Sequence, residues 1–477
     1  MKKFGIIVAV VAALGVAGFL GWKMWKGKGE SMATSLPSDI TAVGRVDLKQ
    51  TILDYGVKFE DLKKVLFADN EETGIDFVTP AYLFSSEGML GAIVGVSDEK
   101  DLEQFLTKKG NTVEEQRGLK WSTIDGNILV AFNDNRAMMM GPAVGSDLDN
   151  LRNKLAQCIN QSESESGKNT DLYQRLMNRD EPISISTDAG QLPKDLLPEW
   201  LADLVKNVNL DELFLSAGLK VHDNRFTLSL GTQTEDATIN GFQDRIDAIA
   251  KEVDASLLAT APSNSALHLE MALDGEKLLE MLRENKTIRT MLIMVNTLFD
   301  FDMIVKNIQG DMSLTVPKID GHGDMNVLFQ AQLKDDAFMK NVSGWNDVMT
   351  RIAGIKFNST GDNRASVSWD GKNYFFATNN KRLSISNNQS LAYAEARNDL
   401  KYNVSDEMKG NLLFCSLSLD ELDIAKDFEI FADKPITYYF QRVDFAIKNS
   451  REYKLELVGK DGKDILRDWM KGVKDER

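Results

Sequence analysis

One short string places a serine and a lysine at a spacing that is used in catalysis. Ser97-Asp98-Glu99-Lys100 matches the pattern S-x-x-K, which in serine acyltransferases puts a lysine one helical turn from a nucleophile. The companion strings S-D-N and K-T-G do not occur in the chain. Position 97 also falls where a predicted strand ends and a helix begins. We therefore predict that Ser97 caps free backbone N–H groups and has no catalytic role.

Three histidines leave few options for metal binding or general-base chemistry. His322 is flanked by Asp320 and Asp324 in the string IDGHGDM, and two carboxylates with an imidazole could hold a metal ion. A glycine-rich hairpin loop needs the same residue types, and this is our interpretation. His222 falls near a predicted hairpin tip, and His268 falls on the less apolar face of a strand.

The remaining candidates are equally weak. Asp300 and Asp302 could act as acid and base, but carboxylate pairs arise freely among 72 acidic residues, and sequence shows no separation in space. Cys158 and Cys415 stand in no CxxC or zinc spacing, so we predict free thiols that pack as small hydrophobes. GxSxG, Walker A, HExxH and EF-hand strings are absent. We predict no catalytic, cofactor-binding or metal-binding residue, and no cofactor.

The elements that would position such residues recur along the chain. In residues 36–53 a strand with alternating apolar and polar residues follows Pro37, and the same pattern recurs in residues 261–278 after Pro262. The second strand places Leu267, Leu269, Met271 and Leu273 on one face, and His268, Glu270 and Ala272 on the other. This recurrence predicts an internal duplication.

Later elements repeat in the same order. A strand that runs into a helix occurs at 88–106 and again at 324–342, and a hairpin with a polar tip occurs at 213–231 and at 439–459. We expect an anchor and tether over 1–35, a first half over 36–254 with modules at about 36–160 and 180–254, and a second half over 262–477 with modules at about 262–390 and 408–475.

The predicted class is α+β, with mainly antiparallel sheets, helices packed on their faces, and one N-terminal transmembrane helix. Helices are expected at 240–253, 278–305 and 462–474, and a solvated loop at 162–169. The helical run 278–305 carries four methionines that could line an adaptable binding groove, although core packing explains them as well. These are Met281, Met291, Met294 and Met303.

The N-terminus predicts a membrane segment. Residues 5–22 are 18 residues without a charge, which is long enough to cross most of a bilayer core of roughly 30 Å. Lys23, Lys26 and Lys28 lie between this segment and the small residues near Ala33, which is unusual for a cleavage site. We expect an uncleaved single-pass anchor in the inner membrane, with the body in the periplasm, and a cleaved signal peptide is the alternative.

The string LPSDITAVGRVDLKQTIL, with its proline and its strand ending Val46-Asp47-Leu48, resembles an uncharacterised bacterial cell-envelope family that is common in Bacteroidetes. The resemblance covers most of the chain after residue 35. It implies residence in the envelope and no known catalytic residue. Members of that family commonly carry a lipid anchor, whereas this chain has no acceptor cysteine after its apolar segment.

Composition narrows the function. A formal net charge of −16 argues against a nucleic-acid partner, because phosphate neutralisation needs a basic face. We expect a non-enzymatic, membrane-anchored envelope protein that binds a protein partner or ligand outside the cytoplasm. A carrier or chaperone for a lipid or an outer-membrane client is the first alternative, and an envelope hydrolase with an unrecognised site is the second.

Overall fold

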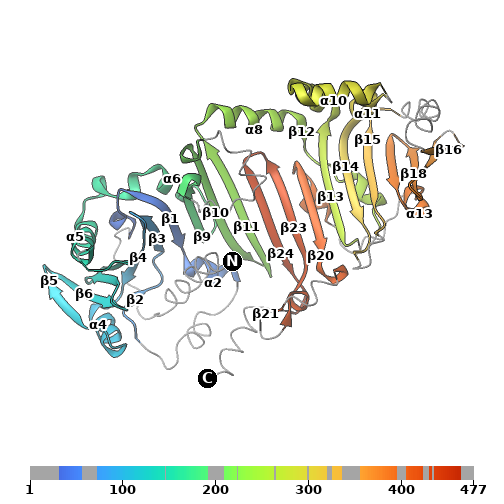
Figure 1. Ribbon diagram of the computed structural model, residues 1–477. Helices are drawn as coiled ribbons and strands as arrows, with labels where there is room; N and C mark the ends of the chain where they lie inside the picture. The colour runs from blue at the N-terminus through green and yellow to red at the C-terminus, as the bar shows by residue number, and fades with distance from the viewer. Residues whose placement is uncertain are drawn as a thin grey trace. The chain divides into compact units, whose positions relative to one another are not determined.

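The computed structural model in Figure 1 describes most of the chain after residue 31. The chain divides into an N-terminal unit, Met1–Ala237 with Asp464–Arg477, and a C-terminal unit, Thr238–Lys463. The structure describes residues 32–55, 72–145, 147–191, 209–222, 224–262, 265–297, 300–319, 325–335, 355–361, 363–394, 404–422, 429–431 and 434–463.

The N-terminal unit is built on an antiparallel sheet in which β1 is a central strand. β1 pairs with β3 along one edge and with β9 along the other. The sheet runs β5-β6-β7-β8-β4-β3-β1-β9-β10-β11, and the short β2 pairs with the end of β4. The strands are β1 (Ile40–Val46), β2 (Ile75–Asp76), β3 (Ala81–Ser86), β4 (Met89–Val96), β5 (Val113–Gln116), β6 (Leu119–Ile124), β7 (Ile128–Phe132), β8 (Arg136–Gly141), β9 (Ile183–Asp188), β10 (Leu213–His222) and β11 (Arg225–Thr234).

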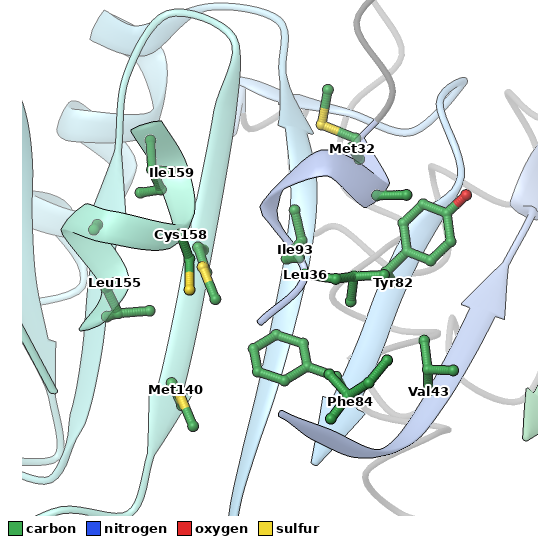
Figure 2. Packing of buried hydrophobic residues seen from close by; sticks show 14 of the residues in the cluster. Met32, Leu36, Val43, Tyr82, Phe84, Ile93, Met140, Leu155, Cys158 and Ile159 are labelled. Atoms are coloured by element: carbon green, nitrogen blue, oxygen red, sulfur yellow. The ribbon is translucent and has the colours of Figure 1, made fainter. Parts of the chain in front are cut away.

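Helices cover both faces of this sheet. One face packs against η1 and α5 through an apolar core that includes Leu36, Phe84, Ile93 and Leu155, as Figure 2 shows. Burying each such side chain stabilises the unit by roughly 1.5–3 kcal/mol. The other face packs against α4. The described helices are η1 (Met32–Ser35), α2 (Leu48–Tyr55), α4 (Glu99–Lys108), α5 (Asp147–Asn160), η2 (Glu163–Glu165), η3 (Gly167–Asn169), α6 (Asp171–Met177), η4 (Ala189–Gln191) and η6 (Leu210–Glu212).

The C-terminal unit is also built on an antiparallel sheet. Its order is β16-β17-β18-β19-β15-β14-β13-β20-β23-β24, and the short β12 pairs with β13. The strands are β12 (Ala250–Lys251), β13 (Leu267–Asp274), β14 (Ile308–Val316), β15 (Leu328–Leu333), β16 (Lys356–Gly361), β17 (Arg364–Trp369), β18 (Lys372–Asn379), β19 (Arg382–Ser386), β20 (Leu413–Ser418), β23 (Phe440–Asn449) and β24 (Glu452–Gly459), with a separate pair of β21 (Glu429–Phe431) and β22 (Lys434–Pro435).

Three consecutive helices, α9 to α11, form a tier on this unit, and Figure 1 shows α10 and α11 at one end of β14 and β15. Leu279, Leu292 and Val305 hold the tier together as a buried cluster. The described helices are α8 (Ala237–Ile249), η7 (Ser256–Thr260), α9 (Gly275–Glu284), α10 (Lys286–Asn296), α11 (Phe301–Asn307), α13 (Gln389–Ala392), α14 (Ser405–Met408), η8 (Leu419–Glu421) and α16 (Ile436–Tyr439).

The two units have the same strand order, so positions can be matched between them through the pairing. β1 corresponds to β13, β3 to β14, β4 to β15, β8 to β19 and β9 to β20. Val43 pairs with Phe84 in one unit where His268 pairs with Thr315 in the other. The chemistry of the two sheets can therefore be compared position by position.

The predicted α+β fold with a transmembrane helix is wrong. The described residues are mostly antiparallel sheet, with 22 strands besides the separate pair β21 and β22, and the helices between them are short. The second module predicted for each half does not form a separate sheet, because β9 and β20 pair with the free edges of β1 and β13. No helix among the described residues is long and apolar enough to cross a bilayer. Residues 5–22 lie outside the described residues.

Two local predictions also need correction. The run 278–305 forms three helices and not one, because Asn285 ends α9 and caps α10 by accepting from the backbone N–H groups of Thr287 and Ile288. The predicted loop at 162–169 contains η2 and η3, and its buried Ser166 donates a 2.9 Å hydrogen bond to the Ala33 carbonyl oxygen. The predicted helix at 462–474 lies almost wholly outside the described residues.

Candidate functional site

The S-x-x-K string has a structural role. Asp98 caps α4, because its Oδ1 accepts from the backbone N–H groups of Lys100 at 2.8 Å and Asp101 at 3.1 Å. Ser97 is exposed, and its Oγ donates to the Ile75 carbonyl oxygen at 3.3 Å. The prediction of a cap at Ser97 is thus wrong by one residue.

The carboxylates of Asp300 and Asp302 hold the helical tier together. Asp300 caps α11 by accepting from the Met303 backbone N–H at 3.0 Å. Asp302 accepts from the Asn296 side-chain amide at 2.8 Å and forms an ion pair with Arg283. The Asp300 carboxylate is bound to the backbone and the Asp302 carboxylate to two side chains, so the two do not form an acid–base pair.

The other candidates do not form a site in the part of the chain that the structure describes. Asp320, His322 and Asp324 lie outside it. Within the described ranges no group of three or more histidine, cysteine or acidic side chains is suited to a metal ion. Cys158 and Cys415 are free thiols; burial raises the pKa of Cys158 to about 11 and also raises that of Cys415.

A chain of hydrogen-bonded side chains lies inside the C-terminal unit, on the strand face that carries His268. His268 Nδ1 lies 2.8 Å from Thr315 Oγ1, and its Nε2 lies 3.0 Å from Glu270 Oε2. Asp311 continues the chain through carboxyl–carboxyl hydrogen bonds to Glu270 and to Asp254. We call these five residues the buried acid chain, because Glu270 is 0% and Asp311 1% exposed. Asp254, at the end of the chain, is exposed.

The strands position this chain through their period of two. His268 and Glu270 stand on one face of β13, and Asp311 and Thr315 stand on the same face of the sheet, on the neighbouring strand β14. Asp254 comes from the connection between β12 and η7, and its backbone N–H lies 3.2 Å from both carboxylate oxygens of Asp311. The buried acid chain therefore fastens this connection to the sheet.

Burial determines the protonation of the chain. Burial, followed by the hydrogen bonds with Asp254 and Glu270, raises the pKa of Asp311 to about 9. The hydrogen bond with Asp311 lowers the pKa of Asp254 to about 2, so the two carboxyl groups hold one proton between them at neutral pH. Burial also raises the pKa of Glu270 to about 7 and lowers that of His268 to about 4.

Carboxyl groups with raised pKa values beside a histidine with a lowered pKa are typical of acid–base catalysis, but the geometry favours another role. The acid and base groups at Asp311, Glu270 and His268 are buried, so a substrate has no access to them. The chain can store a proton and hold the connection through Asp254, and these are structural effects.

Sequence reasoning missed the buried acid chain. A histidine and a glutamate two residues apart on one strand face, His268 and Glu270, were a usable signal. Asp254 and Asp311 gave none, because their pairing depends on strands that meet only after folding.

The exposed surface of α10 is the second notable feature. Met291 is 55%, Ile293 61% and Met294 58% exposed, although each stands beside the buried Leu292 on the same helix. The methionines of the predicted groove are thus divided, since Met303 packs into the sheet core. Exposed apolar side chains gathered on one helix mark an interaction site more often than scattered ones do.

A small open pocket lies beside β20, β23 and β24. Its walls include Glu407, Asp444, Lys454 and Glu456. These charges are already paired, Asp444 with the nearby Arg442 at 2.8 Å and Lys454 with Glu456 at 3.0 Å. The pocket offers little net charge to a ligand.

Comparison with known proteins gives a family without an activity. No curated protein matches the chain. Two solved structures, titled crystal forms I and III of TP0453, are 13% and 11% identical, each over 48% of this chain and over 89% and 90% of theirs, with a TM-score of 0.27. A score this low supports no argument. The family described as a domain of unknown function (DUF4836) matches residues 36–424, and the chain belongs to that family.

Proposed function

We propose that this chain is a non-enzymatic protein of the bacterial cell envelope that binds a partner or ligand through the exposed face of α10. The observation that carries the proposal is the exposure of Met291, Ile293 and Met294 on a helix that packs on its unit through the buried Leu292. Methionine side chains are flexible and polarisable, so they suit a surface that adapts to its partner. The uncharged residues 5–22 support envelope localisation outside the cytoplasm, with the N-terminal segment as the anchor.

Photo-crosslinking in living cells tests this proposal. A photoreactive residue replaces Met294 in the full chain, and the matched control carries it at Lys372, an exposed position on β18 of the same unit. We expect an envelope component to be captured at position 294 and not at 372. The same products at both positions, or none at 294, would contradict binding through α10.

A second candidate function is a carrier or chaperone for a lipid or an outer-membrane client. The same exposed methionines favour it, because Met-rich surfaces accept varied apolar ligands. Native mass spectrometry of the purified chain would then show a retained lipid, and the chain would slow aggregation of an unfolded outer-membrane protein. Neither effect should survive Met291→Ser with Met294→Ser.

A further inference from the structure

The segment that directly follows the predicted tether is part of the core of the N-terminal unit. Met32 is 4% exposed, and Ala33 and Leu36 are both 0% exposed. They belong to the same apolar cluster as side chains of α5, β3 and β4, and Figure 2 shows Met32 and Leu36 among these residues. Residues that are cut from a mature chain cannot fill its core, so this burial bears on how the N-terminus is processed.

The backbone of this segment is held by residues 161–167, which we call the clamp. The Gln161 side-chain amide donates to two carbonyl oxygens of the segment, at 2.8 Å each. The Ser166 hydroxyl donates to the Ala33 carbonyl oxygen at 2.9 Å, and the Gly167 backbone N–H donates to a further carbonyl contact at 2.8 Å. The segment is therefore fixed through its backbone as well as through its side chains.

The C-terminal unit has a matching segment at the matching place. Since Pro37 corresponds to Pro262, residues 32–37 correspond to residues 257–262. Both segments are buried at their first, second, fourth, fifth and sixth positions and are more exposed at the third. In the C-terminal unit the segment lies in the middle of the chain, where it contributes to a buried cluster and cannot be removed with a leader. The shared pattern indicates that the N-terminal unit needs its own copy.

A cut after Ala33, where the sequence offers small residues for cleavage, would place a charge unfavourably. Arg136 is 6% exposed, and its Nη1 donates to Thr34 Oγ1 at 2.8 Å and to Ser35 Oγ at 2.7 Å. A chain that began at Thr34 would carry an α-ammonium group there, beside a buried guanidinium of the same sign. It would also lose the side chains of Met32 and Ala33 from the core.

We infer that residues 32–36 are a permanent part of the folded body, which no processing step removes, and that the clamp passes any load on the preceding chain into the sheet. The inference rests on the proposed function only for the anchor at residues 5–22. With that anchor in place, residues 23–31 span at most about 30 Å when fully extended. The N-terminal unit then stays near the surface of the membrane that holds the anchor.

Intact mass spectrometry of the full-length, C-terminally tagged chain, extracted from the cells that produce it, tests whether the segment is kept. We expect a mass that begins at residue 1, or at residue 2 after removal of the initiator methionine. A start beyond the apolar segment but at or before Met32 would support the inference and remove the anchor from the proposed function. A start at Ala33 or later would overturn the inference.

Hydrogen exchange of the full chain in detergent tests the clamp. Gln161→Ala with Ser166→Ala removes three hydrogen bonds to the segment, so exchange in residues 32–37 should become about tenfold faster or more. Residues 89–96 of β4 should stay protected, which shows that the unit is folded. Ser164→Ala changes an exposed hydroxyl of the same clamp and is the matched control.

If β4 also loses protection in the double variant, Gln161→Ala alone is the milder change, and it should speed exchange in residues 32–37 in the same direction by a smaller factor. Exchange in this segment that is equal in these variants and in the Ser164→Ala control would overturn the role of the clamp.

Discussion

The sheets of the two units have the same strand order but differ in chemistry on one face. This is the face that carries Val43 in the N-terminal unit and His268 in the C-terminal unit, and we call it the inner face. At six matched positions this face is apolar in the N-terminal unit and polar in the C-terminal unit, although the N-terminal face also carries the buried Ser184 and Ser186 on β9. Val43, Phe84, Tyr82, Ile93, Met138 and Met140 correspond in this order to His268, Thr315, Ser313, Gln330, Ser384 and Ser386.

This contrast shows that the strand order does not depend on the inner face. Backbone ladders make the same pairs in both units, and the inner side chains only have to satisfy one another. Gln330 does so by donating to Thr260 Oγ1 at 2.8 Å and to Ser384 Oγ at 3.3 Å. Burying polar groups costs stability that apolar residues would supply, so the polar face is a feature of the C-terminal unit that stability alone does not explain.

The largest effect is expected when the residues at one matched position are exchanged between the two units. Ile93→Gln buries an amide among apolar neighbours, and we expect it to lower the free energy of unfolding by about 3–5 kcal/mol. The reverse change, Gln330→Ile, should cost only about 1–2 kcal/mol, because Thr260 still donates to the Leu257 carbonyl oxygen. Urea unfolding measures both, and equal losses would show that the two inner faces are equivalent.

The second largest effect is expected in the pH dependence of stability, which should differ between the two units. The pKa of Asp311 rises from 3.8 to about 9 on folding, so the folded unit keeps a proton that the unfolded chain releases. Its contribution to stability is complete below pH 3.8 and is lost as the pH rises to about 9, at up to about 1.4 kcal/mol per pH unit. Glu270 acts in the same direction up to about pH 7, and His268 opposes it between about pH 4 and 6.5.

Asp311→Asn should therefore remove the pH dependence of stability that remains above about pH 7, where Asp311 is the member of the buried acid chain that still titrates. Between about pH 7 and about pH 9 the unchanged protein should lose about 2–3 kcal/mol, and the variant should lose little. Urea unfolding at a series of pH values measures this difference. A variant with the original slope would contradict the buried proton, and Asp335→Asn, an exposed change, is the control.

A smaller effect should come from the pair Phe84 and Gly91, which corresponds to Thr315 and Leu328. A Cβ at position 91 would lie 2.1 Å from Phe84 Cζ, so Gly91→Ala should cost about 1–3 kcal/mol. Phe84→Leu in the same chain should recover part of this loss in thermal unfolding. No recovery would mean that the aromatic ring is not what excludes the methyl group.

The smallest effect on stability is expected on α10. Met291→Ser with Met294→Ser changes exposed side chains and should stay within about 0.5 kcal/mol. The neighbouring Leu292→Ala should cost about 2–4 kcal/mol, because Leu292 is buried against Leu279. Thermal unfolding of the two variants measures the difference, and a large loss in the methionine variant would show that these methionines are part of the core.

Local alternation predicted the strands well. The expected hairpins at 213–231 and 439–459 are confirmed as β10 with β11 and β23 with β24. The strand expected after Pro262 is confirmed as β13. These elements depend on neighbouring residues, which is why their pattern was visible in the sequence.

Pairing between distant strands could not be predicted. The joining of β9 to β1 brings Thr187 opposite Ala42, and no local signal encodes that contact. The buried acid chain was missed for the same reason, since Asp254 and Asp311 meet only through the folded sheet. The exposure of Met291 and Met294 also depends on which side of α10 packs on α9, and the sequence allowed either side.

The central place of β1 has a consequence for how the chain emerges during synthesis. β1 is made early, but its second edge stays open until β9 follows well over a hundred residues later. β13 repeats this delay with β20 in the C-terminal unit. Each unit must therefore close a long loop before its sheet is complete, which favours slow folding and leaves an open strand edge that other chains could join. Protection of the nascent chain until both units are complete is the matching requirement for a protein with this topology.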